Sequence, residues 1–304
     1  MFKKLFKKRN INSYYIKHEF YGKAVVTVLG IFLIIITLCL VLFILSKGIN
    51  TFTKDHVSII DFLFSTTWKP ESEPLMVGVL IFFIGSLLVS LIALIISTPL
   101  SIGTAIFMTE ISPKLGKKLL QPSIEIFMGI PSVVYGWVGL SVLVPFISKT
   151  FGGLGFSLLA GGLVLSIMIF PTITSVAADS FRALPSDFKE ASYALGATRW
   201  QTIRKVLLPT AMPGILTGVV LGLARAFGEA LAVQMVIGNA IGLPKSLLNS
   251  TTTLTSILTM DMGNTVDGSP WNNALWSMAL LLLVISFLFI VLIHKIGSKR
   301  GAHK

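Results

Sequence analysis

Residues 211–237 read AMPGILTGVVLGLARAFGEALAVQMVI, an apolar stretch interrupted only by the charges of Arg225 and Glu229. A helix of about 20 residues is long enough to cross the hydrocarbon core of a bilayer. A charged side chain is costly at that depth, so its presence marks a position with a functional or structural task. The stretch therefore predicts a membrane-spanning helix that carries two charges.

Five uncharged stretches of comparable length occur along the chain, at residues 24–45, 76–98, 126–147, 154–178 and 274–293. The whole chain is 54% hydrophobic and only 12% charged, whereas an ordinary soluble domain has roughly 25% charged residues. This composition favours membrane lipid as the solvent. The sequence predicts an all-α, polytopic membrane helix bundle with six transmembrane helices.

The basic residues are distributed unevenly between the two sides of this bundle. If successive segments alternate in side, 19 Lys and Arg residues lie on one side and 5 on the other, while the acidic residues divide evenly. Basic residues collect on the cytoplasmic side of membrane proteins, so both termini are predicted to be cytoplasmic. The net charge of +12 thus reflects topology, and no nucleic-acid partner is expected.

The spans divide the chain into segments of different character. The first span exceeds a signal peptide in length, so we interpret it as an uncleaved, peripheral anchor. In the external segment after it, TTWKP at 66–70 is interpreted as an interfacial anchor, with contact to a partner as the alternative. The predicted segments are a cytoplasmic basic N-terminus 1–23, a peripheral helix 24–45, an extracellular segment 46–75, a core domain 76–293 and a cytoplasmic basic tail 294–304.

The sequence contains no motif for metal binding or for catalysis. The only cysteine, Cys39, lies in the first span, so the chain alone can form no disulfide or thiolate metal site. An intramembrane enzyme would need a Ser/His, paired Asp or metal constellation, which the spans do not contain. A channel that conducts without ATP is a further alternative. The four histidines lack metal-ligand spacing and lie outside or at the ends of spans: His18, His56, His294 and His303.

Residues 179–210, which we call the elbow, join the fourth and fifth spans on the predicted cytoplasmic side. Helix formers and apolar spacing over 190–204 predict a short helix. Gly196 interrupts it and Pro209 is expected to end the helix after this interruption. The elbow is therefore predicted to contain two short helices that meet at a bend.

The elbow carries a spaced motif: Glu190-Ala191-Ser192, three residues, Gly196, nine residues, Val206, one residue, then Leu208-Pro209. It resembles the EAA loop of bacterial ABC importer permeases, with Ser192 in place of the second alanine. The resemblance implies a type I ABC importer transmembrane fold in a bacterial cell membrane, with a cytoplasmic coupling helix at 190–209 that docks into an ATP-binding subunit. A solvated loop is the alternative.

The same resemblance implies roles for individual residues. The chain has no phosphate loop of the pattern GxxxxGK followed by Ser or Thr, so ATP and its Mg would be bound by a partner, expected as a homodimeric subunit. The chain itself is expected to be a transport subunit without cofactor or catalytic activity. The residues implied in coupling to the ATPase are Glu190, Ala191, Ala194, Gly196, Leu208 and Pro209.

A narrower resemblance covers nearly the whole chain from Thr66 onward. GLARAFGEALAVQMVIGN at 222–239, FMGIPSVVYG at 127–136 and TTWKP at 66–70 are similar to phosphate ABC transporter permeases of the PstC type. The PstA type shares the RAxGE core but lacks the MVIGN ending. The resemblance implies inorganic phosphate as substrate, a second permease of the PstA type and an extracellular phosphate-binding protein. Another oxyanion, such as phosphonate, molybdate or sulfate, is the alternative.

Arg225 lies near the middle of its span, one helical turn before Glu229 on the same predicted face. A guanidinium stays charged and donates two parallel hydrogen bonds to an oxyanion. We predict that both residues line the substrate pathway, paired when it is empty, with Arg225 contacting phosphate in transit. In the alternative, the pair only fixes helix packing between subunits. Gly214, Gly218 and Gly222 recur every four residues beside this face and are predicted to let another helix approach closely.

Overall fold

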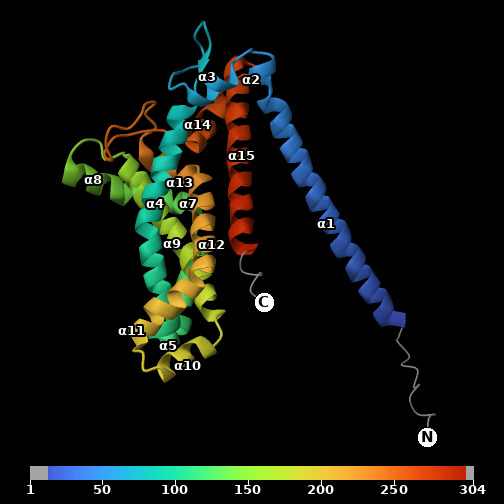
Figure 1. Ribbon diagram of the computed structural model, residues 1–304. Coiled ribbons are helices and arrows are strands. Elements are labelled where there is room, and N and C mark those ends of the chain that lie inside the picture. The colour runs from blue at the N-terminus through green and yellow to red at the C-terminus, as the bar shows by residue number, and fades with distance from the viewer. Residues whose placement is uncertain (1–12, 299–304) are drawn as a thin grey trace. The chain divides into compact units, whose positions relative to one another are not determined.

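The computed structural model describes residues 13–298, and these fold almost entirely into helices (Figure 1). The chain divides into two units, residues 1–47 and 48–304. The first unit contains one helix, α1 (Ser13–Gly48), and its exposed surface is predominantly apolar, as expected for a helix surrounded by lipid. Residues 1–12 of the predicted basic N-terminus and 299–304 of the predicted basic tail lie outside the described residues.

Six stretches of helix among the described residues are long and apolar enough to cross a membrane. Their number confirms the predicted all-α fold with six spans, while the limits of all six differ from the prediction. The second extends 13 residues beyond its predicted end, from residue 98 to Ile111, and the predicted third and fifth are broken. The six stretches are Tyr21–Thr53, Leu80–Ile111, Ser132–Phe151, Leu158–Arg182, Arg199–Phe227 and Pro270–Ile293.

Two short helices and a β-hairpin precede the bundle in the second unit. They are α2 (Asn50–Thr53), α3 (Ile59–Phe64) and an antiparallel hairpin of β1 (Trp68–Lys69) and β2 (Met76–Val77). Trp68 is only 8% exposed, and its ring packs edge-on against Phe82 with centroids 5.2 Å apart. The hairpin folds the indole into the core, so Trp68 does not supply the interfacial anchor predicted for TTWKP.

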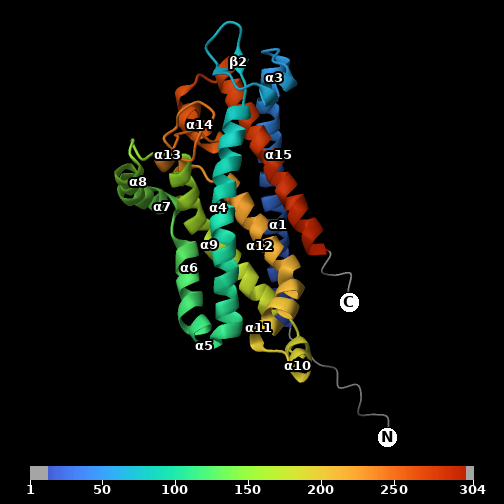
Figure 2. The same ribbon diagram turned by 60° about the vertical axis from the view of Figure 1, so that its left-hand side comes forward.

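The third predicted span, 126–147, is not one helix. α6 (Gln121–Gly129) is followed by Ile130 in an extended conformation, and α7 (Ser132–Val138) begins after Pro131. Proline disfavours helix at the preceding residue and has no N–H to donate, which explains the break. A π-helical turn, η3 (Gly139–Leu143), and α8 (Val144–Phe151) complete the stretch. α6 lies beside α9, whereas α7 and α8 run in a different direction (Figure 2).

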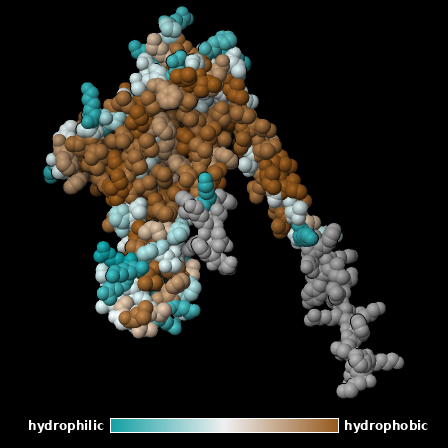
Figure 3. Space-filling view, in the orientation of Figure 1, coloured by the Kyte–Doolittle hydropathy of each residue, from teal (hydrophilic) through white to brown (hydrophobic). Residues whose placement is uncertain are grey.

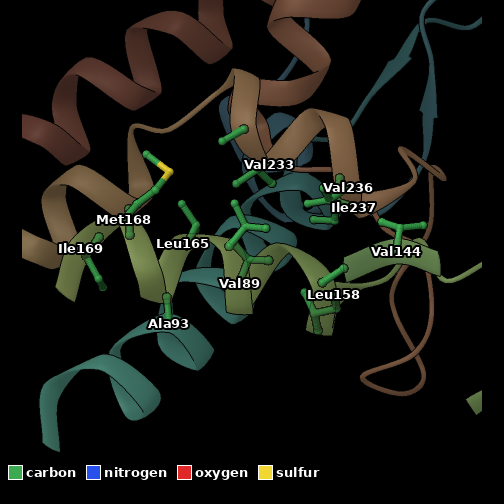
Figure 4. Packing of buried hydrophobic residues seen from close by; sticks show 14 of the residues in the cluster. Val89, Ala93, Val144, Leu158, Leu165, Met168, Ile169, Val233, Val236 and Ile237 are labelled. Atoms are coloured by element: carbon green, nitrogen blue, oxygen red, sulfur yellow. The ribbon is translucent and has the colours of Figure 1, made fainter. Parts of the chain in front are cut away.

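The centre of the bundle is the contact between α4 (Leu80–Ile106) and α9 (Leu158–Arg182). Gly161 and Gly162 allow this approach, because a side chain on either would meet Val89 or Ile92 of α4. α13 (Leu231–Ile237) packs on α9, and the apolar side chains of several helices interdigitate there (Figure 4). The labelled members of this core are Val89, Ala93, Val144, Leu158, Leu165, Met168, Ile169, Val233, Val236 and Ile237.

The remaining elements join or cover the bundle. η1 (Phe107–Ile111), α5 (Pro113–Leu115) and η2 (Gly116–Leu120) lead from α4 to α6. α14 (Leu254–Asp261) and the short η5 (Met262–Asn264) precede α15 (Pro270–Ser298), which packs against α12 (Leu208–Phe227). The elbow contains α10 (Asp187–Ala194), α11 (Arg199–Thr202) and the π-helical turn η4 (Ile203–Leu207).

Gly85 and Gly103 lie on the same helix, α4, in different surroundings. A Cβ on Gly85 would collide with the carbonyl oxygen of Thr252, whereas nothing lies within 4 Å of a Cβ on Gly103. Alanine otherwise favours a helix over glycine by about 1 kcal/mol, and overpacking costs about 1–3 kcal/mol. We expect Gly85→Ala to lower the melting temperature of the purified protein and Gly103→Ala to maintain or raise it. Equal melting temperatures for the two variants would contradict this packing.

Candidate functional site

The predicted fifth span is broken next to its two charges. α12 ends at Phe227 and α13 begins at Leu231, so Arg225 lies in the last turn of α12 and Glu229 lies in the break. The prediction of one continuous helix over 211–237 is wrong. Gly228 follows the last residue of α12 and the chain turns there, so Arg225 and Glu229 do not share the face of one helix.

Each of the two charged side chains has a partner other than the one predicted. Arg225 is half-buried, and its Nη1 donates to Thr172 Oγ1 of α9 at 2.9 Å. Glu229 Oε1 accepts from the backbone N–H of Ala232 at 3.1 Å, which satisfies a free donor in the first turn of α13. No ion pair joins Arg225 and Glu229 in this structure, whose described residues include both. The predicted pairing of the empty site is therefore wrong.

Hydroxyl groups of α14 cover the break from a distant part of the sequence. Thr255 Oγ1 donates to the carbonyl oxygen of Glu229 at 2.6 Å, and Thr259 Oγ1 donates to Gln234 Oε1 of α13 at 2.7 Å. These residues were not predicted as part of a site. The Ser/Thr-rich composition around 250–259 was their only sequence signal, and it does not indicate which carbonyl or amide they contact.

A tyrosine brings α7 into the same region. The hydroxyl of Tyr135 donates to the carbonyl oxygen of Phe127 at 2.7 Å, across the break at Pro131. α7 and α13 are closely packed, since a Cβ on Gly136 would lie 2.8 Å from the Cα of Ala232. The packing of α7 on α13 therefore places the break at Pro131 beside the helix that follows Arg225 and Glu229.

The predicted small-residue stripe lies along the contact between α12 and α9. Gly214, Gly218 and Gly222 are all buried. A Cβ on Gly218 would lie 3.0 Å from the Cβ of Val176, and one on Gly222 would lie 2.8 Å from Ile173 Cγ1. The close approach of the two helices brings Arg225 within hydrogen-bonding distance of Thr172.

The elbow bends at Gly196, as the sequence predicted. Its φ of +78° favours glycine, and it follows Leu195, the residue after the end of α10. Thr198 then begins α11 with a capping box that includes Gln201. Pro209 does not end the second helix, because α11, η4 and α12 form one stretch from Arg199 to Phe227. The π-helical turn before Pro209 accommodates its ring and its missing N–H, so that prediction is wrong.

Charged side chains of the elbow bind η1, which follows α4, and a hydrogen bond between two hydroxyls joins the two helices of the elbow. Lys189 Nζ lies 2.9 Å from the carboxylate of Glu110, whose side chain is only 8% exposed. Arg199 Nη2 donates to the backbone carbonyls of Glu110 and Ile111. Ser192 is buried and hydrogen-bonds Thr202 at 2.9 Å, which joins α10 to α11. The departure from the EAA pattern thus has a structural role that the sequence did not reveal.

The six residues predicted to couple to an ATPase fall into two groups. Glu190, Ala191 and Ala194 lie exposed on α10, and Gly196 lies exposed just after it, whereas Leu208 and Pro209 belong to the first turn of α12. Apolar side chains are exposed around the first group. Phe188, Tyr193 and Leu195 lie outside the spans, with Leu195 exposed to 89%, and Trp200 lies in the first turn of the fifth span. This is a surface suited to a protein partner.

A family model described as "Binding-protein-dependent transport system inner membrane component" matches residues 98–300. The chain belongs to this family. As an ABC transporter permease, it is a transport subunit without catalytic activity, and it works with an ATPase and a binding protein.

Curated relatives agree with this family over most of the chain. The "Probable ABC transporter permease protein YqgH" of Bacillus subtilis is 54% identical over 283 residues, covering 93% of this chain and 92% of the relative. The "Phosphate transport system permease protein PstC" of Mesorhizobium japonicum is 36% identical over 265 residues, covering 79% of this chain and 80% of the relative.

A solved structure supports the fold assignment. A chain of a bacterial alginate ABC transporter superposes with a TM-score of 0.62 at 16% identity, covering 94% of this chain and 97% of that chain. At this identity the likeness concerns the fold alone. The fold is that of a type I ABC importer permease, as predicted from the EAA motif.

The ion pair between Lys189 and Glu110 should contribute to stability, because Glu110 is shielded from water. We expect Lys189→Ala to cost about 1–3 kcal/mol, since it leaves a buried charged acceptor without its partner. The measurement is the melting temperature of the purified protein. Lys118→Ala, which changes an exposed lysine nearby, is the control. The charge exchange Glu110→Lys with Lys189→Glu should recover part of the loss, and no difference between Lys189→Ala and Lys118→Ala would contradict this role.

Proposed function

We propose that this chain is a PstC-type permease of a phosphate ABC importer in a bacterial cell membrane. It would form the translocation pathway with a second permease of the PstA type, receive inorganic phosphate from an extracellular binding protein, and be driven by a homodimeric ATP-binding subunit. The phosphate assignment is supported by the PstC relatives, and the observation that carries it is the placement of Arg225 inside a span without a carboxylate partner among the described residues.

The surroundings of Arg225 suit a transient anion site. A guanidinium has five N–H donors, and the hydrogen bond to Thr172 uses one of them. That partner is neutral, and Arg225 forms no ion pair with a described residue. In a medium of low dielectric constant a cation without an ion-pair partner attracts an oxyanion strongly. The carboxylate of Glu229, at the adjacent break, would repel the anion and so shorten the time that it stays bound at Arg225.

The elbow supplies the contact with the ATPase in this proposal. The exposed face of α10, with Ala191 and Ala194, would dock into a groove of the ATP-binding subunit, with the exposed apolar side chains around it buried in the interface. Force on α10 reaches the bundle through the ion pair of Lys189 with Glu110 and through the continuous helix from Arg199 to Phe227. The elbow and both termini would lie in the cytoplasm, where the basic residues collect.

Removal of the Arg225 charge tests the substrate assignment. We expect Arg225→Gln to reduce phosphate uptake roughly tenfold to a hundredfold, because hydrogen bonds to charged groups contribute about 1.5–3 kcal/mol. Uptake of radioactive phosphate is measured in cells that lack other phosphate importers. ATP hydrolysis by the purified complex and its subunit composition show whether assembly is intact.

Two further variants and a competition assay sharpen this test. Thr172→Val keeps the guanidinium and removes its hydrogen bond, so it should reduce uptake less than Arg225→Gln. Lys114→Gln, at an exposed lysine of α5 outside the elbow, should leave uptake unchanged. An assembled, ATP-hydrolysing Arg225→Gln complex with normal uptake would refute the transit role. Stronger inhibition of wild-type uptake by phosphonate, molybdate or sulfate than by unlabelled phosphate would favour that anion as substrate.

Bulky side chains on the docking face of α10 should block coupling. We expect the double variant Ala191→Leu with Ala194→Leu to lower the amount of ATP-binding subunit that co-purifies with the permease at least about tenfold. Overpacking a close contact costs about 1–3 kcal/mol per site. Both alanines are exposed, so the fold of the permease should persist. Ala183→Leu, at an exposed alanine just after α9, is the matched control. Normal recovery of the ATPase with the double variant would place the interface elsewhere.

A further inference from the structure

A polar cavity lies at the elbow end of the bundle, away from Arg225. Its volume is about 420 Å³, and its walls come from η1, η2, α6, the end of α9 and α10. The polar and charged side chains in its lining are Thr109, Glu110, Lys117, Gln121, Arg182 and Lys189. Figure 3 shows hydrophilic side chains gathered at this end of the bundle, next to a hydrophobic band.

The cavity carries a net positive charge. Its lining contains three basic side chains and one acidic one, Glu110, and that carboxylate is already paired with Lys189. Arg182 donates to Gln121 Oε1 at 3.0 Å and pairs with Asp179, which is well exposed. Lys117 has no hydrogen bond or ion pair with another described residue, and its amine is free to bind an anion.

Apolar side chains are exposed on other faces of the helical segments that wall the cavity. They are Leu115 in α5, Leu119 in η2 and Ile126 in α6, and none of them lines the cavity itself. In a membrane protein, exposed apolar side chains next to a span contact acyl chains. Basic cavities between helices at the end of a bundle bind the head groups of anionic lipids. A basic cavity next to the hydrophobic band of the bundle therefore matches an amphipathic anion better than a free one.

We propose that this cavity binds the phosphate group of an anionic phospholipid, with the acyl chains lying along the hydrophobic band next to it. Lys117 and Arg182 contact the phosphate oxygens. The bound head group lies beside the Glu110–Lys189 ion pair that joins the elbow to η1. Occupancy of the cavity therefore stabilises the same end of the bundle on which the proposed ATPase docks.

The test uses the full chain, purified with its accompanying subunits in detergent, and native mass spectrometry with added lipid. Phosphatidylglycerol and phosphatidylcholine with identical acyl chains serve as the anionic and the zwitterionic probe. We expect the first phosphatidylglycerol to bind more tightly than phosphatidylcholine. Lys117→Ala should weaken phosphatidylglycerol binding about fivefold, the contribution of one basic residue near an anionic surface, and should leave phosphatidylcholine binding unchanged.

Matched variants show whether the lipid binds in this cavity or is attracted by the surface charge in general. Lys118→Ala removes the adjacent exposed lysine, which does not line the cavity, and should not weaken binding. Lys117→Glu should abolish the preference for phosphatidylglycerol and the rise in melting temperature that this lipid produces. Equal effects of Lys117→Ala and Lys118→Ala would overturn the proposal. Stabilisation by inorganic phosphate at this site, without any effect of phosphatidylglycerol, would overturn the assignment to a lipid.

Discussion

Inside a bilayer every backbone N–H and C=O needs a partner within the protein, because lipid offers none. Two of the spans predicted from the sequence, 126–147 and 211–237, are broken, and at each break a side chain supplies that partner. Tyr135 donates to Phe127 across the break at Pro131, and Thr255 donates to Glu229 between α12 and α13. These hydrogen bonds permit irregular backbone at the ends of the helices, and both Tyr135 and Arg225 lie beside it.

The two functional regions are connected by continuous structure. The stretch from Arg199 to Phe227 begins in the elbow and ends two residues after Arg225. Its glycines hold it against α9, which carries Thr172. In the coupling that we propose, a displacement of the elbow changes the hydrogen bond of Arg225, because one helical stretch joins the two. The π-helical turn of this stretch lies at the end next to the elbow. This arrangement is a mechanical basis for the coupling that we propose.

We assign anions to two places in this structure. One is Arg225 in the bundle, next to the carboxylate of Glu229, and the other is the basic cavity beside α10. The two differ in their neighbours. Arg225 contacts a neutral hydroxyl on a packed helix, whereas Lys117 is exposed beside apolar side chains. We accordingly assign a transported oxyanion to the first and a membrane lipid to the second.

The amino-acid sequence alone determined the number of spans, the bend at Gly196 and the family, because these depend on local properties: long apolar runs, a glycine with positive φ and a motif of fixed spacing. The tertiary structure decided the partners of Arg225, the burial of Trp68 and the hydrogen bond between Ser192 and Thr202. Each of these depends on residues far apart in the chain or on the path of the backbone between them. A hydrogen bond acts only over about 3 Å, so no periodicity along the chain could show which helix would bring Thr172 or Thr255 to the break.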